Sequence, residues 1–241
     1  MLVDRRDEGS LTILFYSRAI ILMNIIFDID DTLFPSSEFS ALARRNALNA
    51  MIDMGLDYSY EELNEKLSSI IKSKGSNYGK HFDDLCLSLG LAEPSRYVAA
   101  AVAAYHDTKA SIAPFPKIAL TLLNLRSQGH RLYVATNGSS VKQWDKLIRL
   151  GLELYFERVF VSESLGMEKC KEFYEKMCSE LGAEARDCLM VGDREDADVA
   201  SAKEAGMLTV RVLQGKHRHE PSSADHIIEE TSAVFGIVQR L

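Results

Sequence analysis

The feature that most constrains the fold of this chain is a repeated alternation of helical segments with short apolar strands. In four units, a helical pattern ends at a glycine and an apolar stretch follows. Glycine suits the position after a helix because it adopts left-handed backbone angles without a Cβ clash. Such alternation indicates crossover connections and a mostly parallel sheet. The glycines and the strands predicted after them are Gly129 with 131–135, Gly151 with 158–161, Gly182 with 188–191 and Gly206 with 207–213.

Two further strands and a helical insertion complete the predicted architecture. Residues 24–27 and 226–228 predict the first and last strands, and a closing helix is expected over 229–241. From 36 to 112 the sequence carries helix signals and no convincing strand. We therefore expect an α/β fold, in which residues 23–35 and 113–241 form a Rossmann-like parallel sheet with helices on both faces. An all-helical cap domain over 36–112 would lie at the carboxyl end of the sheet, where such folds bind ligands.

Composition and charge narrow the class of protein. The 241 residues carry a net charge of −7, and 46% of them are hydrophobic. An acidic chain is a poor candidate for binding nucleic acid or anionic membranes, and no apolar run approaches the roughly 20 residues of a membrane span. The four cysteines form no Cys-x-x-Cys pair, so neither a zinc site nor a disulfide framework is indicated. We expect a cytoplasmic protein.

The first 22 residues are predicted to be an N-terminal extension outside the core. Their mixed charges do not match the positive start of a signal peptide. An alternative is that translation begins at Met23, one residue before the first strand. The sequence alone leaves open whether residues 1–22 belong to the native protein.

Acidic residues gather where the first strand ends. Asp28, Asp30 and Asp31 lie within four residues, and Thr32 follows them. Carboxylates this close together repel each other unless a cation offsets their charge, although a simple Asp-rich turn is an alternative. Asp193 ends another apolar strand and would lie at the same sheet edge, because the carboxyl ends of parallel strands face one way. Asp28, Asp30 and Asp193 are therefore candidate ligands of a hard divalent cation such as Mg²⁺.

Two other strand ends carry groups suited to phosphate. Thr136, Asn137 and Gly138 end a third strand, where a hydroxyl and backbone N–H groups at a helix start suit phosphate oxygens. Lys169 follows a fourth strand and is a candidate for neutralising phosphate charge. Each position is weak evidence by itself, but together they outline one site.

With these residues, the chain resembles the haloacid dehalogenase (HAD) superfamily over nearly its whole length from residue 24. The first motif of that family, Asp-x-Asp-x-Thr, is matched by Asp28, Asp30 and Thr32. The remaining motifs are matched by Thr136, by Lys169, and by Gly192 with Asp193 and Asp198. The helical insertion resembles the cap of the subfamily that contains phosphoglycolate phosphatases and haloacid dehalogenases.

Two positions depart from the family pattern. Cys170 replaces the proline that often follows the lysine of the third motif, and Lys171 is an alternative to Lys169. The spacing from Gly166 favours Lys169. Arg194 stands where a small residue is usual, and either contacts phosphate or the cap or points to solvent.

The resemblance implies a magnesium-dependent phosphohydrolase that cleaves a small phosphate monoester. Asp28 would be the nucleophile that becomes an aspartyl-phosphate, and Asp30 would be the general acid and then the general base. Thr136 and Lys169 would bind the transferring phosphoryl group. The other implied roles are Mg²⁺ ligation by Asp28, the Asp30 backbone carbonyl and Asp193, substrate binding by Thr32, Asn137, Gly138 and Arg194, and support of Lys169 or a metal-bound water by Asp198.

Three other functions are compatible with the same fold. A 2-haloacid dehalogenase also uses an aspartate nucleophile, but it needs neither the metal nor the second aspartate. A phosphomutase is another family activity, and a catalytically silent binding module belongs to a different class. The expected partner is a small phosphorylated metabolite, with no nucleic acid or membrane, and the chain is expected to be a monomer or a homodimer.

Overall fold

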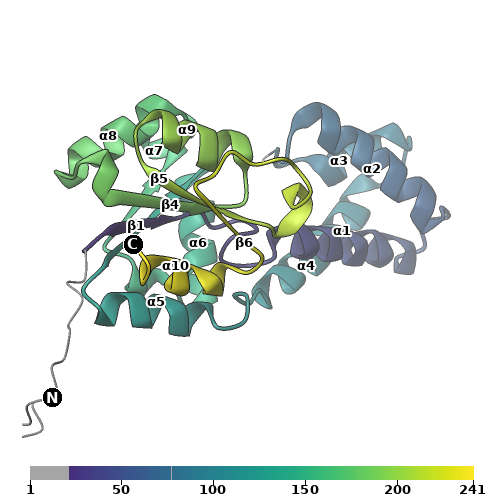
Figure 1. Cartoon of the computed structure of the whole chain (residues 1–241). Coiled ribbons are helices and arrows are strands. Elements are labelled where there is room, and N and C mark those ends of the chain that lie inside the picture. Colours follow the sequence, from purple (N-terminus) through teal and green to yellow (C-terminus); the bar gives the residue numbers. More distant parts are fainter. Residues whose placement is uncertain (1–21, 77) are drawn as a thin grey trace, which may run out of the picture.

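The core of the molecule is a six-stranded sheet in which all pairings are parallel (Figure 1). A computed structural model describes residues 22–76 and 78–241, so the N-terminal extension predicted over 1–22 lies almost entirely outside the described residues. The strand order is β3-β2-β1-β4-β5-β6. The strands are β1 (Asn24–Phe27), β2 (Arg131–Thr136), β3 (Arg158–Val161), β4 (Cys188–Gly192), β5 (Leu208–Val212) and β6 (His226–Ile228).

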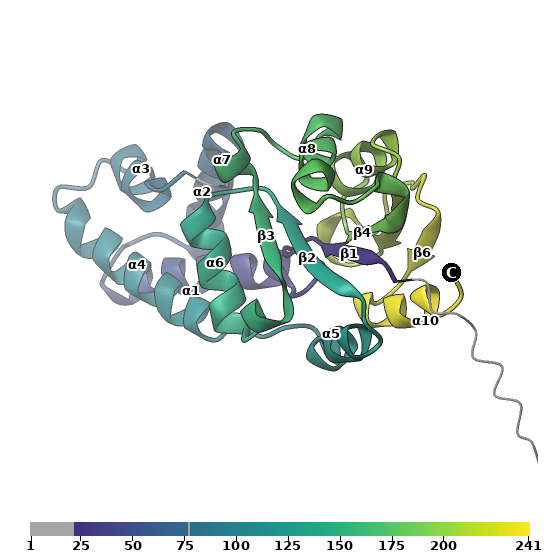
Figure 2. The same cartoon turned by 90° about the vertical axis from the view of Figure 1, so that its left-hand side faces the viewer.

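Helices cover both faces of this sheet. Side chains of successive strand residues point to opposite faces, and both faces are apolar, so each face needs a covering layer. Along β1, Ile25 and Phe27 pack toward α5 (Ile118–Ser127), α6 (Ser140–Leu150) and α10 (Val234–Val238). Ile26 packs on the other side, toward α8 (Lys171–Leu181) and α9 (Ser201–Glu204). Figure 2 shows these two layers of helices. The predicted α/β architecture with helices on both faces is confirmed.

Four helices form an insert between β1 and α5, with an apolar core of its own. They are α1 (Ser36–Asp53), α2 (Tyr60–Lys74), α3 (His81–Ser88) and α4 (Pro94–Ala110). The expected capping box is present, since Ser59 and Glu62 bond reciprocally at the start of α2. The helical insert α1–α4 lies beyond the carboxyl end of the sheet (Figure 1). Its status as a separate cap domain with bounds 36–112 stays a prediction.

The remaining elements are short. They are η1 (Glu153–Tyr155), α7 (Ser162–Leu165), η2 (Ala185–Asp187), η3 (Glu195–Ala200), η4 (Gly215–His217) and η5 (Thr231–Ala233). The closing helix predicted over 229–241 is reduced to η5 and α10, because the chain first turns at Thr231, whose hydroxyl donates to the Thr32 carbonyl. None of the helices in the described part of the chain combines the length and apolar character of a membrane span.

Candidate active site

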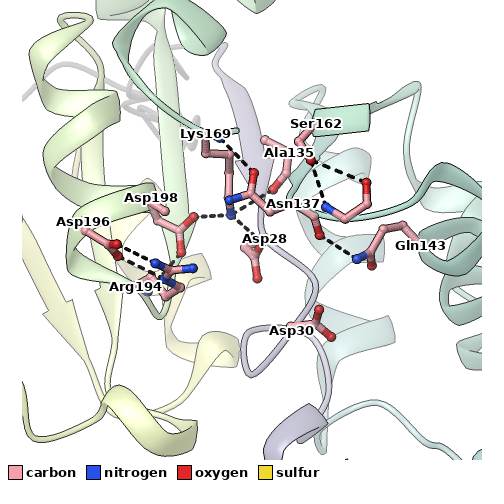
Figure 3. Close-up of polar contacts among 12 residues, drawn as sticks. Asp28, Asp30, Ala135, Asn137, Gln143, Ser162, Lys169, Arg194, Asp196 and Asp198 are labelled. Atoms are coloured by element: carbon pink, nitrogen blue, oxygen red, sulfur yellow. Dashed lines mark hydrogen bonds and ion pairs between the residues drawn. The ribbon is translucent and has the colours of Figure 1, made fainter. Parts of the chain in front are cut away.

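Four loops meet at the carboxyl edge of the sheet and carry the residues that the sequence singled out (Figure 3). Asp28 follows β1, and Asn137 follows β2. Lys169 lies between α7 and α8, and Asp193 and Asp198 follow β4. Parallel pairing brings Phe27 level with Val134 on one side and Val191 on the other, so the loops that follow start at one level. The topology therefore gathers side chains from distant parts of the sequence into one site.

Lys169 is the cation at the centre of this site. Its Nζ lies 2.5 Å from Asp28 Oδ1, contacts the Asp198 carboxylate, and lies 3.4 Å from the Ala135 carbonyl oxygen. Only 2% of its side chain is exposed. Lys171, the alternative considered from the sequence, is exposed at the start of α8 and pairs with Glu175 at 3.3 Å. The structure thus brings Lys169, and not Lys171, into the cluster.

Asn137 and its neighbours fix the backbone around Lys169. The Lys169 backbone N–H donates to Asn137 Oδ1 at 2.8 Å, and Gln143 Nε2 donates to the Asn137 carbonyl at 2.7 Å. The Gly138 N–H donates to Ser162 Oγ at 2.9 Å. The loops after β2 and β3 are therefore tied together. The Gly138 N–H, expected from the sequence to be free for phosphate, already has a protein partner.

Three buried carboxylates form an acidic cluster around this lysine. Oxygen atoms of Asp28, Asp193 and Asp198 all lie within 4.8 Å of one another. Burial, followed by the negative charges of Asp28 and Asp198, raises the pKa of Asp193 to about 9. Burial also raises the pKa of Asp28 to about 7, against the opposing effect of Lys169. One ammonium group does not balance three carboxylates, and their oxygen donors suit a hard divalent cation.

Asp198 owes its place to a departure from regular helical geometry. The segment η3 has π-helical turns, in which the Val199 N–H donates to the Arg194 carbonyl at 3.2 Å. Asp198 is fully buried, and its Oδ2 accepts the Arg194 N–H at 3.0 Å. Its carboxyl group lies directly over the Cα of Gly192, where any Cβ would overlap it. The glycine of the Gly-Asp motif is thus required by a close approach within the site.

The three carboxylates of the loop after β1 have three different partners. Asp28 pairs with Lys169, whereas both carboxylate oxygens of Asp30 lie 2.6 Å from Lys146 Nζ. Asp31 has a positive φ of 54°, and its carboxylate accepts the Ser37 backbone N–H at 2.8 Å at the start of α1. Among the described residues, the acidic cluster therefore draws one side chain from this loop, with Asp193 and Asp198 supplying the others.

Comparison with known proteins identifies the family. The model of the haloacid dehalogenase-like hydrolases matches residues 25–212, which is more than half of the chain. The chain belongs to this family. It is 43% identical over 225 residues to the glyceraldehyde 3-phosphate phosphatase of Methanocaldococcus jannaschii, covering 91% of this chain and 98% of that protein. It is 45% identical over 226 residues to the protein of the same name from Methanopyrus kandleri, covering 90% and 97%.

A solved structure confirms the fold. The HAD-hydrolase YfnB from Bacillus subtilis, bound to magnesium, superposes with a TM-score of 0.64 at 22% identity and covers 90% of this chain and 99% of that one. The family resemblance and the HAD-type phosphatase predicted from the sequence are confirmed by these relatives. They favour the phosphatase over the dehalogenase, the mutase and the silent module.

Three other predicted residues of this HAD hydrolase occupy different surroundings. Thr32 is fully buried, and its carbonyl accepts the Thr231 hydroxyl at 2.6 Å, which anchors the loop that follows β1. Thr136 is buried at the end of β2. The side chain of Arg194 is 42% exposed and its Nε lies 3.0 Å from Asp196 Oδ1. The guanidinium group therefore has a partner in the protein, and the pKa of Arg194 is raised first by this hydrogen bond with Asp196 and also by the charges of Asp198 and Asp193.

Sequence reasoning missed Lys146, Gln143 and the role of Asp31. Lys146 and Gln143 lie on α6 and contact residues from other loops. No spacing in the sequence links Lys146 to Asp30, which lies 116 positions earlier. The pairing of Asp31 with Ser37 spans six residues, and no capping motif signals it, because the N-cap of α1 is Pro35, which has no side-chain cap bond.

Gly192→Ala should damage both stability and catalysis. The new methyl group displaces the Asp198 carboxyl and, through it, the Lys169 ammonium. We expect a loss of about 1–3 kcal/mol in the free energy of unfolding and a fall in kcat on the order of 100-fold. Denaturant unfolding and steady-state kinetics measure the two effects. Gly236→Ala is the control, because a Cβ there meets open space; equal effects of the two substitutions would contradict the steric argument.

Proposed function

We propose that this chain hydrolyses glyceraldehyde 3-phosphate, with Mg²⁺ as cofactor and Asp28 as nucleophile. The observation that carries the substrate is the 43–45% identity, over about nine tenths of both chains, to two proteins named for that activity. The site supports the reaction class, because a buried lysine contacts the candidate nucleophile beside two further carboxylates. The helical insert α1–α4 would act as the cap over residues 36–112, in a monomer or homodimer. All four cysteines are free thiols, which fits the cytoplasmic location we propose.

The acidic cluster fits a magnesium ion. Asp28 and Asp193 would hold it through carboxylate oxygens, and the Asp30 backbone carbonyl is a further candidate ligand. Asp198 is less available, since one oxygen contacts Lys169 and the other accepts the Arg194 N–H. When bound, the ion supplies positive charge that offsets the repulsion between the phosphate and the carboxylates.

In the first step we propose that Asp28 attacks the phosphorus atom in line. A bond forms between an Asp28 carboxylate oxygen and phosphorus, while the bond from phosphorus to the glyceraldehyde oxygen breaks. Asp30, in its protonated form, gives its proton to that departing oxygen. Lys169 and Thr136 would bind the phosphoryl oxygens, since positioning and charge neutralisation are the main tools of phosphoryl transfer. Asn137 holds the Lys169 backbone in place for this task.

In the second step water releases the phosphate. Asp30, now a carboxylate, takes a proton from water, the water oxygen bonds to phosphorus, and the bond from phosphorus to Asp28 breaks. The enzyme returns to its starting state with Asp28 ionised and Asp30 protonated. Glyceraldehyde and inorganic phosphate are the products. The dehalogenase alternative would leave Asp30 and Asp193 without a role, which is why the phosphatase is the better account of this site.

The substrate and the nucleophile are tested together. The wild-type chain with Mg²⁺ should release inorganic phosphate from glyceraldehyde 3-phosphate faster than from phosphoglycolate or nucleotides. Asp28→Asn should lower kcat by at least about 1,000-fold, because the amide is nearly isosteric but a poor nucleophile. Its melting temperature should remain close to that of the wild type. A phosphate-release assay and thermal unfolding give the two readouts.

The control for this substitution is Asp53→Asn, at an exposed position at the end of α1. It removes the same charge far from the site and should leave turnover unchanged. Wild-type turnover by Asp28→Asn would reject the nucleophile assignment. A strong preference for another phosphate ester would reject the substrate and leave the reaction class standing.

Magnesium binding should release protons and strengthen as pH rises. Without the ion, Asp193 has a pKa of about 9 and Asp28 of about 7, so at pH 7 Asp193 holds a proton that a cation must displace. Below these pKa values the competing protons weaken binding, by up to roughly tenfold per pH unit and proton. Titration calorimetry of Mg²⁺ binding in buffers of different ionisation enthalpy measures the released protons. Asp193→Asn should bind Mg²⁺ weakly and with less proton release. A wild-type affinity for Mg²⁺ that does not change from pH 6 to 8 would contradict the coupling between proton release and metal binding.

A further inference from the structure

Asp30 is held by a lysine that belongs to none of the four family motifs. Lys146 Nζ, on α6, lies 2.6 Å from each oxygen of the Asp30 carboxylate. The Lys146 side chain is 19% exposed and that of Asp30 is 37% exposed, so the pair lies at the edge of the site. The same ammonium lies 5.8 Å from the centre of the Phe34 ring. Lys146 therefore contacts both ends of the short loop that joins the nucleophile to the helical insert.

The helix that carries Lys146 is itself fixed on three sides. One turn earlier, Gln143 is buried and donates to the Asn137 carbonyl. The next residue, Leu147, has no exposed surface and packs in the sheet core. Asp145 pairs with Lys109 of α4 at 2.5 Å, which links α6 to the helical insert. Lys146 thus projects from a rigid support rather than from a free surface helix.

Asp30 needs such a support more than its neighbours do. Asp28 is buried against Lys169, and Asp31 is bound to the start of α1, but over a third of the Asp30 side chain faces solvent. The carboxylates of Asp30 and Asp28 also repel each other. Proton transfer requires a carboxyl oxygen within about 2.6–3.2 Å of the group it serves, so a turn of the Asp30 side chain toward water would stop it.

We propose that Lys146 is a positioning residue for this reaction, which holds the Asp30 side chain in place in both steps. The ammonium pairs with the Asp30 carboxylate when it accepts a proton from water, and it donates to the carbonyl oxygen of the protonated carboxyl group when that group delivers its proton. The proposal rests on the function proposed above. Two lysines then divide the work: Lys169 serves the nucleophile, and Lys146 serves the acid–base group. Lys146 acts through Asp30 and takes no part in bonding to phosphorus.

This role makes the importance of Lys146 depend on the leaving group. The alkoxide of glyceraldehyde leaves poorly without a proton, whereas p-nitrophenolate leaves without one. Lys146→Met should therefore lower kcat for glyceraldehyde 3-phosphate by about 10–100-fold, a part of the 100–10,000-fold that general acid–base catalysis contributes. KM should change by less than about threefold, since no substrate contact is lost. With p-nitrophenyl phosphate, the first-turnover burst of p-nitrophenol should keep nearly its wild-type rate while steady-state turnover slows.

The experiment compares four single variants and one double variant with Mg²⁺ present. Lys146→Met keeps the apolar stem against Phe34 and removes the charge, and Lys146→Arg keeps the ion pair and should retain most activity. Lys176→Met, at an exposed position on α8, removes the same charge elsewhere and should leave kcat unchanged. Asp30→Asn alone and combined with Lys146→Met completes a double-mutant cycle. If Lys146 acts through Asp30, the second substitution should change kcat by less than about twofold once Asp30 is already altered.

The outcomes separate this role from others. Equal losses in the first-turnover rate with both esters, or losses that multiply in the double variant, would show an action independent of Asp30 and overturn the proposal. A rise in KM alone would make Lys146 a substrate-binding cation instead. An unchanged Lys146→Met enzyme would overturn only the Lys146 role, while a wild-type chain that releases no phosphate would overturn the proposed function as well. Melting temperatures of all variants show whether a loss comes from unfolding.

Discussion

The site depends on one buried ammonium group placed between two carboxylates. Burial alone would lower the pKa of Lys169, but the charges of Asp198 and Asp28 overcome this and hold it well above its usual value. A buried charge is tolerated only when it is paired and hydrogen-bonded, so Lys169 requires a carboxylate partner. The carbonyl of Ala135 and the amide of Asn137 complete the surroundings of Lys169. Its position joins the loops after β1, β2, β3 and β4 into a single unit.

The negative charge of the acidic cluster nonetheless exceeds the positive charge of Lys169, and this excess prepares the site for a cation. Asp193 adds a third buried carboxylate next to a single lysine, and its raised pKa records the cost of ionising it there. A protein that needed only stability would pair or remove such a group. Retaining it makes sense where a divalent cation balances the carboxylates and offsets their repulsion of a phosphate. The residues of the chain alone thus do not balance the negative charge of the site in this hydrolase.

Much of the fold could be predicted because its signals are local. The strands at 24–27, 158–161 and 226–228 agree with the structure at both ends, since short apolar runs bounded by polar residues have few alternatives. The closing helix was overestimated, because its apolar pattern continues past the turn that Thr231 makes to contact Thr32. That Asp28, Lys169 and Asp193 lie near one another could be expected from the strand ends, but their pairings could not. The sequence placed Asp28, Asp30 and Asp31 in one acidic turn, and only three-dimensional packing assigns them to Lys169, Lys146 and Ser37.

The bond from Asp31 to Ser37 has a consequence for redesign of this scaffold. Asp31 joins the loop after β1 to the first helix of the insert, and Gly215 from the loop after β5 approaches so closely that a Cβ would overlap the Asp31 carboxyl. The loop after β1, the start of α1 and the loop after β5 therefore pack together at Asp31. In a chimaera that exchanges α1–α4 for another helical insert, the first turn of the new helix must offer Asp31 a backbone N–H, as Ser37 does. Gly215 must also be kept. A graft joined anywhere inside 31–37 would remove the bond between Asp31 and Ser37 and so disturb the loop that carries Asp28.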